Sequence, residues 1–348
     1  MSARTVAAVL EKINAPLVLA ELELPALKPG QVLVEVAFAG VCHTQLLECR
    51  GFRGEDRFLP HCLGHEGSGV VQEIGPGVTR CRPGDRVALS WIKGPGADVS
   101  GTVYRWHDRQ VNAGGVTTFA RHTVVSENRV TVIPAELDLQ DAALLGCAVA
   151  TGVGAVVNTA RVRAGQSVAV FGTGGVGLCA VAGARLAGAQ PVVAIDASPD
   201  RLRIAQALGA SHTVLAGQQD AVAAVRAHCP GGVDAAFEVC GKPEVTGQAL
   251  QVVRPQGGVA VVVGNARHGE MLVIDPREFN QGKRLLGTWG GDNIPDRDFP
   301  RYARLLQTGR LPLSPLHSPP FRLADINSAL SALEQQQVAR PLIDMRLE

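Results

Sequence analysis

The second half of the chain alternates short apolar runs with longer stretches of helical period. Buried strands are predicted at "SVAVF", "PVVAID", "HTVL", "VDAAFEV", "GGVAVVVG" and "RLLGTWG". Helices are predicted at "GVGLCAVAGARLAGA", "PDRLRIAQALGA", "DAVAAVRAHC" and "EVTGQALQVV", the second of which starts at Pro199 and ends at Gly209. This alternation predicts an α/β domain with a doubly wound, six-stranded parallel sheet.

The first part of the chain has the shorter period of strands. In "QVLVEVAFAGVC" one face carries Val32, Val34, Val36 and Phe38, which predicts a half-buried antiparallel strand. "GSGVVQEIGPGV" and "PGDRVALSW" continue this pattern between Gly and Pro turns. Residues 93–115 are polar and Gly-rich and predict a long, irregular surface excursion. Near the end, "DFPRYARLLQTG" predicts a helix and "ARPLIDMRL" a returning strand.

Length, composition and charge indicate a two-domain globular protein and argue against several other classes. With 348 residues the chain is too long for one ordinary core, and we expect domains at 149–290 and at 1–148 with 291–348. A net charge of +1 and 4% aromatic residues give no bias toward nucleic acid or anionic membranes. None of the eight cysteines forms C-x-x-C, and there is neither a signal peptide nor a membrane-spanning run, so we expect reduced thiols in the cytoplasm.

A glycine-rich motif follows the first predicted strand of the α/β domain. In "VAVFGTGGVG" the spacing G-x-G-x-x-G is provided by Gly172, Gly174 and Gly177, between a strand and a helix. These glycines allow a tight turn, a close approach to a pyrophosphate and close packing of helix on strand. Asp196 ends the next strand, where an acid binds the adenosine ribose and favours NAD over NADP. The alternatives are another nucleotide-binding or adenosyl-binding sheet and, for Asp196, a cap of the next turn.

The stretch "GHEGSG" at 64–69 places His65 and Glu66 among glycines. The pair suits either a turn exposed to water or part of a metal site. No second histidine follows four residues later, so the helical zinc-protease spacing is excluded. The local sequence leaves both interpretations open.

Several motifs occur together in one order: "PGQVLVEVAFAGVCHT", "GHEGSGVV", "PGDRV", "GCAVATG", "GTGGVG" and "ARPLIDM". In this respect nearly the whole chain resembles the zinc-dependent alcohol dehydrogenases of the medium-chain dehydrogenase/reductase superfamily. The resemblance implies a GroES-like, mainly antiparallel β catalytic domain at 1–148 and 291–348. It also implies a Rossmann NAD-binding domain at 149–290.

The resemblance also implies a metal site. Cys42, His65 and Cys147 match the ligands of a catalytic zinc, and two thiolates with one imidazole suit Zn²⁺. Glu66 matches a transient or supporting ligand, the alternative being a solvated turn carboxylate. Thr44 matches the hydroxyl that takes the substrate proton. The remaining cysteines are expected to be small buried hydrophobic residues, namely Cys49, Cys62, Cys81, Cys179, Cys229 and Cys240.

Cofactor and substrate contacts are implied in the same way. His43 and Arg340 match basic residues at the cofactor pyrophosphate, although Arg340 also suits an ordinary surface arginine. The other expected cofactor contacts are Gly172, Gly174, Gly175, Val176, Gly177, Asp196, Arg201 and Gly264. The expected substrate contacts are Trp91, Phe119 and Asn112.

Three departures from the family pattern affect the expectations. No cysteine lies in the region of 91–115, where many relatives hold a structural zinc, so we expect one zinc per chain. Gln45 stands where the family usually has an aspartate behind the zinc histidine, and it brings no charge. Leu47 stands where some relatives have a histidine that passes the proton to solvent, so we expect the proton route here to end in the cofactor ribose, in water or at His43.

The implied function is hydride transfer between an alcohol and NAD⁺, giving an aldehyde or a ketone. Small residues at Ala113 and Gly114, near the polar His107 and Arg109, favour a substrate larger or more polar than ethanol, such as a polyol or sugar-like alcohol. The alternatives are a zinc-free enone or quinone reductase of the same superfamily and a catalytically silent nucleotide-binding protein. We expect a homodimer, or a tetramer, with no nucleic-acid or membrane partner.

Overall fold

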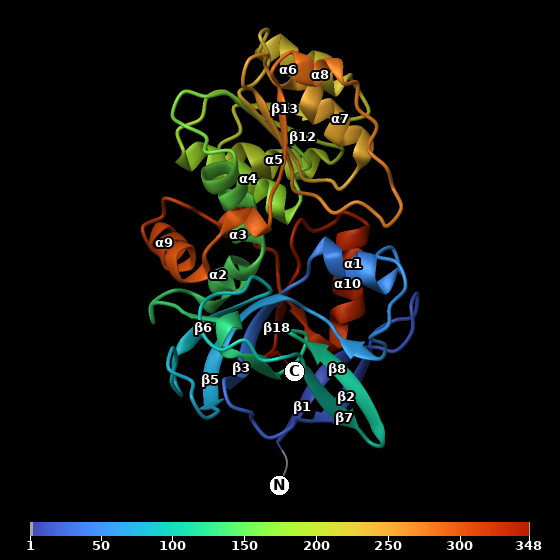
Figure 1. Cartoon of the computed structure of the whole chain (residues 1–348), viewed down its shortest axis with the longest axis vertical. Helices are drawn as coiled ribbons and strands as arrows, with labels where there is room; N and C mark the ends of the chain where they lie inside the picture. Colours follow the sequence, from blue (N-terminus) through green and yellow to red (C-terminus); the bar gives the residue numbers. More distant parts are fainter. Residues whose placement is uncertain (1–2, 348) are drawn as a thin grey trace. The chain divides into compact units, whose positions relative to one another are not determined.

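The computed structural model describes residues 3–347, which form two compact units (Figure 1). Unit 1 comprises the residues up to Cys147, the segment Ile294–Thr308 and the residues from His317 onward. Unit 2 comprises Ala148–Asn293 and Gly309–Leu316. Each unit has its own sheets, and the two are described separately below.

Unit 2 contains the parallel sheet that the sequence predicted. Its strands are β11 (Val168–Phe171), β12 (Val192–Asp196), β13 (His212–Leu215), β14 (Ala235–Glu238), β15 (Val259–Val262) and β16 (Arg284–Gly287). They lie in the order β13-β12-β11-β14-β15-β16, and every neighbouring pair is parallel. Its helices are α3 (Ala148–Gly154), α4 (Gly175–Leu186), α5 (Pro199–Leu208), α6 (Ala221–His228), α7 (Pro243–Val252) and α8 (Arg277–Asn280). The predicted doubly wound, six-stranded fold is confirmed.

Helix α5 shows how the local sequence sets the helix ends. The Ser198 side chain accepts a hydrogen bond from the backbone N–H of Arg201, and Pro199 lies in the first turn, where its missing N–H is not needed. Gly209 follows the last turn with φ of 117°, a left-handed conformation that favours glycine. Both ends lie where the sequence predicted them.

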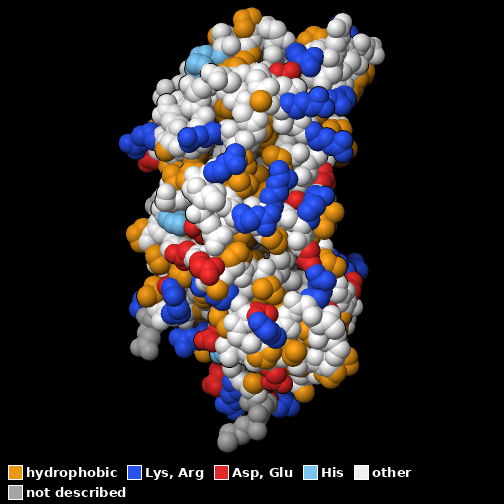
Figure 2. Space-filling model, turned by 90° about the vertical axis from the view of Figure 1, so that its left-hand side faces the viewer, with side chains coloured by type: hydrophobic (Ala, Val, Ile, Leu, Met, Phe, Trp, Pro, Cys, Tyr) orange, Lys and Arg blue, Asp and Glu red, His pale blue; other side chains and the backbone are white. Residues whose placement is uncertain are grey.

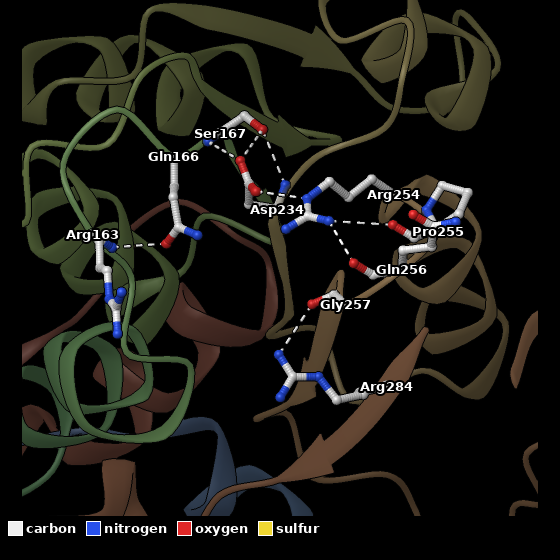
Figure 3. A network of polar contacts seen from close by, with 9 residues as sticks. All are labelled: Arg163, Gln166, Ser167, Asp234, Arg254, Pro255, Gln256, Gly257 and Arg284. Carbon is white, nitrogen blue, oxygen red and sulfur yellow. Dashed lines mark hydrogen bonds and ion pairs between the residues drawn. The ribbon is translucent and has the colours of Figure 1, made fainter. Parts of the chain in front are cut away.

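A polar network joins the starts of two neighbouring strands of this sheet (Figure 3). One carboxylate oxygen of Asp234, just before β14, accepts hydrogen bonds from the backbone N–H of Ser167 at 2.9 Å and from its hydroxyl at 3.0 Å. Its other oxygen accepts from Arg254 Nε at 2.8 Å. Arg254 also donates to the carbonyl of Gln256 at 2.7 Å, so the network fixes the turn after α7.

Removing the charge of Asp234 is expected to destabilise unit 2. Burial opposes ionisation of this carboxyl, but the hydrogen bonds from Arg254 and Ser167 hold its pKa below the ordinary value. Because the pKa is depressed in the folded state, the stabilisation is present above the unfolded-state pKa, near 4, and is lost as pH falls through the folded pKa. For Asp234→Asn we expect a loss of about 1–2 kcal/mol in urea unfolding at pH 7, and a smaller loss near pH 3.

The matched control for this prediction is Asp200→Asn. Asp200 pairs with Arg203, but both side chains are about three-quarters exposed, at 76% and 75%. An exposed pair of this kind contributes little. Equal unfolding midpoints for wild type and Asp234→Asn at pH 7 would contradict the role given to the network.

Unit 1 is built from a small barrel and a second sheet. The closed barrel contains β1 (Arg4–Leu10), β2 (Val18–Glu23), β7 (Thr102–Trp106), β8 (Arg109–Gly114) and β4 (His61–Cys62). The second sheet contains β10 (Val130–Val132), β6 (Arg86–Ser90), β5 (Glu66–Ile74), β3 (Gln31–Gly40), β18 (Leu342–Asp344) and β17 (Phe321–Arg322), with β9 (His122–Ser126) paired to β3. Its α-helices are α1 (His43–Cys49), α2 (Leu139–Ala143), α9 (Pro295–Gln307) and α10 (Ile326–Glu334). The mainly antiparallel, GroES-like unit and the predicted late helix and strand are confirmed.

The prediction of an irregular excursion at 93–115 was wrong for most of its length. Strands β7 and β8 form an antiparallel hairpin within the barrel. Tyr104 and Val111 are 1% and 0% exposed in the barrel core. The hairpin turn includes His107 with φ of 54°. In β7 the buried Thr102 is polar and the exposed Val103 is apolar, which hid the alternation in the sequence.

Strand β3 is more deeply buried than its alternation predicted. Glu35 is its one exposed residue, and every position from Val36 to Gly40 is buried. Neighbouring strands β5 and β9 pair with it, and β18 pairs with its end through Leu342 and Gly40. The buried end of β3 leads directly into α1 and the site described below.

The cysteines without an expected ligand role behave largely as predicted. Cys49, Cys62, Cys81, Cys179 and Cys229 are buried, and Cys240 is partly exposed. Within residues 3–347 no single helix is both long and apolar enough to cross a membrane. Side chains of both charges occur on the face in Figure 2, in keeping with the net charge of +1.

Candidate functional site

Unit 1 brings together the three predicted metal ligands. The ligand atoms of Cys42, His65 and Cys147 all lie within 4.8 Å of one another, and His65 Nε2 is 3.3 Å from Cys147 Sγ. Both cysteines are buried, at 7% and 6% exposure. Two thiolates and an imidazole suit zinc, and three protein ligands leave one position for water or substrate. The donor set therefore fits a catalytic rather than a structural zinc.

Local backbone geometry positions Cys42 and His65, two of the three ligands. Cys42 follows β3 and caps the N-terminus of α1. His65 precedes β5, and its carbonyl accepts from the backbone N–H of Trp91 at 3.0 Å. Gly64 has φ of +94°, and a side chain there would come within 2.4 Å of Thr118 Oγ1, so this turn needs glycine.

The two thiols are electrostatically coupled. A hydrogen bond from Cys147 lowers the pKa of Cys42 well below its ordinary value, and the charge of Arg340 acts in the same direction against the effect of burial. The same hydrogen bond, together with burial, raises the pKa of Cys147. The buried site therefore favours a thiolate at Cys42, and a bound zinc ion would favour the thiolate form of both cysteines.

Gln45 joins the helix cap to the histidine ligand. Its Oε1 accepts from the backbone N–H of Cys42 at 2.8 Å, and its Nε2 lies 2.6 Å from His65 Nδ1. The side chain is 1% exposed, so these partners fix its position. Gln45 thus lies at Nδ1 of the His65 ring, while Nε2 of the same ring lies near Cys147.

A buried ion pair adjoins the ligands. Arg340 Nε donates to Glu66 Oε1 at 2.7 Å, and the two residues are 3% and 0% exposed. Burial opposes the charge of Arg340, but Cys42, Glu66 and Cys147 raise its pKa well above the ordinary value. The alternatives of a solvated turn carboxylate and a surface arginine are therefore wrong. A Cβ at Gly40 would lie 1.9 Å from Glu66 Oε1, so glycine leaves room for this carboxylate.

The expected catalytic and substrate residues lie around this centre at different depths. Thr44 Oγ1 is 3.8 Å from Cys42 Sγ. His43 is exposed at the start of α1. Phe119 has no exposed surface, and its N–H donates to the Leu63 carbonyl at 3.1 Å, beside the turn that holds His65. Asn112 donates to the carbonyl of Phe58 at 2.7 Å. Their roles toward substrate and cofactor stay predictions.

In unit 2 the glycine motif has the geometry that nucleotide binding requires. Gly172 has φ of +93°, and a Cβ at Gly177 would lie 1.8 Å from the Gly172 carbonyl oxygen. A Cβ at Gly174 would meet nothing within 4 Å, so the backbone there borders open space at the start of α4. These observations match the turn, the packing and the close approach expected of the three glycines.

Asp196 lies beside this turn. Its Oδ2 accepts from the backbone N–H of Thr173 at 2.6 Å, and its Oδ1 accepts from that of Ser198 at 2.9 Å. It therefore does cap the following turn, and its role toward a ribose stays a prediction. Burial lowers the pKa of Arg201, while the carboxylate of Asp196 favours its charge. At Gly264 a Cβ would come within 2.1 Å of the Gly241 nitrogen.

Comparisons with known proteins identify the same family over nearly the whole chain. The family model "Zinc-binding dehydrogenase" matches residues 175–308, and "Alcohol dehydrogenase GroES-like domain" matches residues 28–135. S-(hydroxymethyl)glutathione dehydrogenase of Synechocystis sp. is 33% identical, covering 97% of this chain and 98% of that protein. Geraniol dehydrogenase of Castellaniella defragrans is 32% identical, covering 97% and 96%.

A solved structure gives the same result. Benzyl alcohol dehydrogenase of Acinetobacter calcoaceticus has a TM-score of 0.90 and 30% identity, covering 98% of this chain and 99% of that one. Such identity over nearly the full length, together with the three converging ligands, establishes the class of enzyme. The chain therefore belongs to the zinc-binding alcohol dehydrogenases of the medium-chain dehydrogenase/reductase superfamily.

Proposed function

We propose that this enzyme uses NAD⁺ to oxidise an alcohol larger than ethanol to the aldehyde or ketone, and catalyses the reverse reduction. The observation that carries the proposal is the convergence of Cys42, His65 and Cys147 with Thr44 beside them. The relatives named above act, by their names, on a hydroxymethyl adduct, on geraniol and on benzyl alcohol, each bearing a CH₂OH group on a larger body. If the body of the substrate is polar, we propose a polyol or a sugar-like alcohol.

Each residue of the metal site has a separate role in the proposed reaction. Cys42, His65 and Cys147 would hold the zinc ion, which when bound supplies Lewis-acid polarisation of the substrate oxygen. Thr44 takes the proton of the substrate hydroxyl, because a threonine hydroxyl both accepts and donates. Gln45 keeps the His65 ring in its orientation.

The glycine turn of unit 2 would hold the cofactor. Its backbone at the start of α4 would hold the pyrophosphate, and Asp196 would accept hydrogen bonds from the ribose. The hydride chemistry itself belongs to NAD⁺. His43, Arg201, Gly264 and Arg340 are retained as proposed cofactor contacts.

The test is NADH formation by zinc-loaded enzyme with a panel of alcohols. The panel contains ethanol, benzyl alcohol, geraniol, a vicinal diol, a polyol, a sugar alcohol and formaldehyde with glutathione. We expect turnover of one or more of the larger alcohols and inhibition by a zinc chelator. Enone or quinone reduction that is insensitive to the chelator would support a zinc-free reductase. No turnover of any substrate would support a catalytically silent nucleotide-binding protein.

Replacing Asp196 by asparagine is expected to weaken the binding of NAD⁺. A hydrogen bond to a charged acceptor contributes about 1.5–3 kcal/mol, so the KM for NAD⁺ should rise about 10- to 100-fold. The KM for NADP⁺ should rise less or fall, because the charge that repels a 2′-phosphate is gone. Steady-state kinetics with both cofactors, after thermal melting has confirmed folding, checks this, and an unchanged ratio of the two KM values would contradict the role of Asp196.

We also propose a homodimer, or a tetramer. Strand β16 lies at the edge of its sheet, and Met271 and Val273 nearby in sequence are 79% and 89% exposed. An unpaired edge beside exposed apolar side chains suits association between two copies. Sedimentation of the purified protein decides between monomer, dimer and tetramer.

A further inference from the structure

A buried glutamate ends the strand that lies next to the glycine motif. Glu238 is the last residue of β14 and is 1% exposed. It pairs in register with Phe171, the last residue of β11, so both strands end at the same edge of the sheet. The chain runs from β11 to β12 and β13 on one side of this pair, and from β14 to β15 and β16 on the other. Open α/β sheets bind ligands outside the carboxyl ends of their strands where the order reverses, so Glu238 lies at the edge where the cofactor is expected.

The side chain of Glu238 holds the turn that follows it. Its Oε1 accepts hydrogen bonds from the backbone N–H groups of three successive residues, which are Cys240 at 2.6 Å, Gly241 at 2.6 Å and Lys242 at 3.4 Å. Successive N–H groups that converge on one point form an anion-binding concavity. Here the carboxyl group of the protein itself fills that concavity, and it thereby fixes the backbone between β14 and α7.

The turn after β15 is attached to the same strand end. The backbone carbonyl of Glu238 accepts hydrogen bonds from the N–H groups of Val263 at 2.8 Å and Gly264 at 3.0 Å. Gly241 has φ of +71°, and a Cβ at Gly264 would lie 2.1 Å from the Gly241 nitrogen. The two turns therefore touch backbone to backbone, and a shift of one moves the other.

The turn after β14 also borders the glycine motif. Cys240 Sγ donates to the carbonyl of Phe171 at 3.4 Å, and a Cβ at Gly172 would lie 2.7 Å from this sulfur. Lys242 is exposed and Cys240 is partly exposed, whereas Glu238 is buried. A dinucleotide bound at Gly172 would therefore meet this turn and not the glutamate behind it.

The hydrogen bonds of Glu238 offset the cost of burying its carboxyl group. Burial raises the pKa of this carboxyl, while the N–H groups of the turn act in the opposite direction. Oε2 is buried and has no hydrogen-bond partner within residues 3–347. The hold on the turn is thus made through Oε1, and a weaker acceptor at that position would loosen the turn.

We propose that Glu238 is a positioning residue for NAD⁺, because it holds the turn after β14 in the shape that the bound dinucleotide contacts. It acts without touching the cofactor. A loosened turn takes up the binding shape for only part of the time, and the apparent Kd rises in inverse proportion to that fraction. This inference rests on the proposed use of NAD⁺ by the enzyme.

The test compares Glu238→Gln with Glu127→Gln by calorimetric titration of the zinc-loaded enzymes with NAD⁺. Glu127 of unit 1 is 2% exposed and also accepts from three backbone N–H groups, which are those of Thr79 at 2.6 Å, Arg80 at 2.8 Å and Ala97 at 2.9 Å. In both variants an amide is the weaker acceptor and buries an NH₂ group, so both should have a lower melting temperature. Only Glu238→Gln should raise the Kd for NAD⁺, by about tenfold, with kcat at saturating NAD⁺ within about threefold of wild type.

Hydrogen exchange of the wild-type enzyme tests the inference without a substitution. We expect NAD⁺ to slow amide exchange in residues 239–243 and to leave residues 78–84, beside Glu127, unchanged. An equal Kd for wild type and Glu238→Gln overturns the inference, as does an equal rise in Glu127→Gln. If Glu238→Gln does not fold, unchanged exchange at 239–243 overturns it instead. Failure of the proposed function is distinct, because the wild-type enzyme itself would then bind no NAD⁺.

Discussion

Replacing Cys147 with serine is expected to abolish zinc binding and to lower kcat for alcohol oxidation by about 1,000-fold or more. Lewis-acid catalysis contributes several kcal/mol to the reaction, and each 1.36 kcal/mol is a factor of ten in rate. Serine keeps the size of the side chain but replaces a soft thiolate by a hydroxyl that stays protonated near neutral pH. Zinc content per chain and kcat, measured on the same preparation, check the prediction.

The control for this substitution is Cys81→Ala. Cys81 is a buried thiol of the same unit, 8% exposed, and is not one of the three converging ligands. Burial raises its pKa to about 11, so it is an inert thiol at neutral pH. This variant should keep its zinc and its activity. A Cys147→Ser enzyme that bound one zinc and oxidised alcohols at the wild-type rate would refute the ligand assignment.

Replacing Arg340 with leucine is expected to destabilise the protein by about 3–5 kcal/mol. Removing one partner of a buried ion pair leaves the other charge without compensation, and Glu66 is 0% exposed. The guanidinium also favours the Cys42 thiolate, so the variant should bind zinc more weakly in competition with a chelator. Chemical unfolding monitored by tryptophan fluorescence measures the first effect.

The double variant Glu66→Gln with Arg340→Leu is the matched comparison. It removes both charges, and pairs replaced together are often tolerated far better than broken ones. We expect it to regain much of the stability lost by Arg340→Leu alone. If both variants lost the same free energy of unfolding, packing around Arg340 rather than charge would be the cause.

The α/β unit was predictable because every signal in it is local. Six apolar runs alternate with helical stretches, and the glycine spacing at Gly172, Gly174 and Gly177 specifies the turn between β11 and α4. Pro199 and Gly209 mark the ends of α5 because their backbone restrictions act on neighbouring residues only. Such signals need no knowledge of distant contacts.

The buried ion pair, the β7–β8 hairpin and the metal ligands depend on contacts between residues far apart in the sequence. No local pattern in the sequence indicates these contacts. Glu66 reads as a polar turn residue until Arg340, 274 positions later, is seen to pair with it. The β7–β8 hairpin looks irregular in the sequence because Thr102 is polar but buried and Val103 is apolar but exposed, which breaks the alternation where the hairpin begins. The metal ligands came from the family resemblance, since their spacings follow no local rule.

The pairing of Glu66 with Arg340 bears on when the enzyme acquires its metal during synthesis. The ligands at 42, 65 and 147 are synthesised before Arg340 and before strand β18, which pairs with β3. Until then the carboxylate of Glu66 lacks the guanidinium of Arg340, and the end of β3 lacks its pairing with β18. We therefore expect full zinc affinity only once Arg340 lies beside Glu66 and β18 has paired with β3, because the guanidinium also favours the Cys42 thiolate.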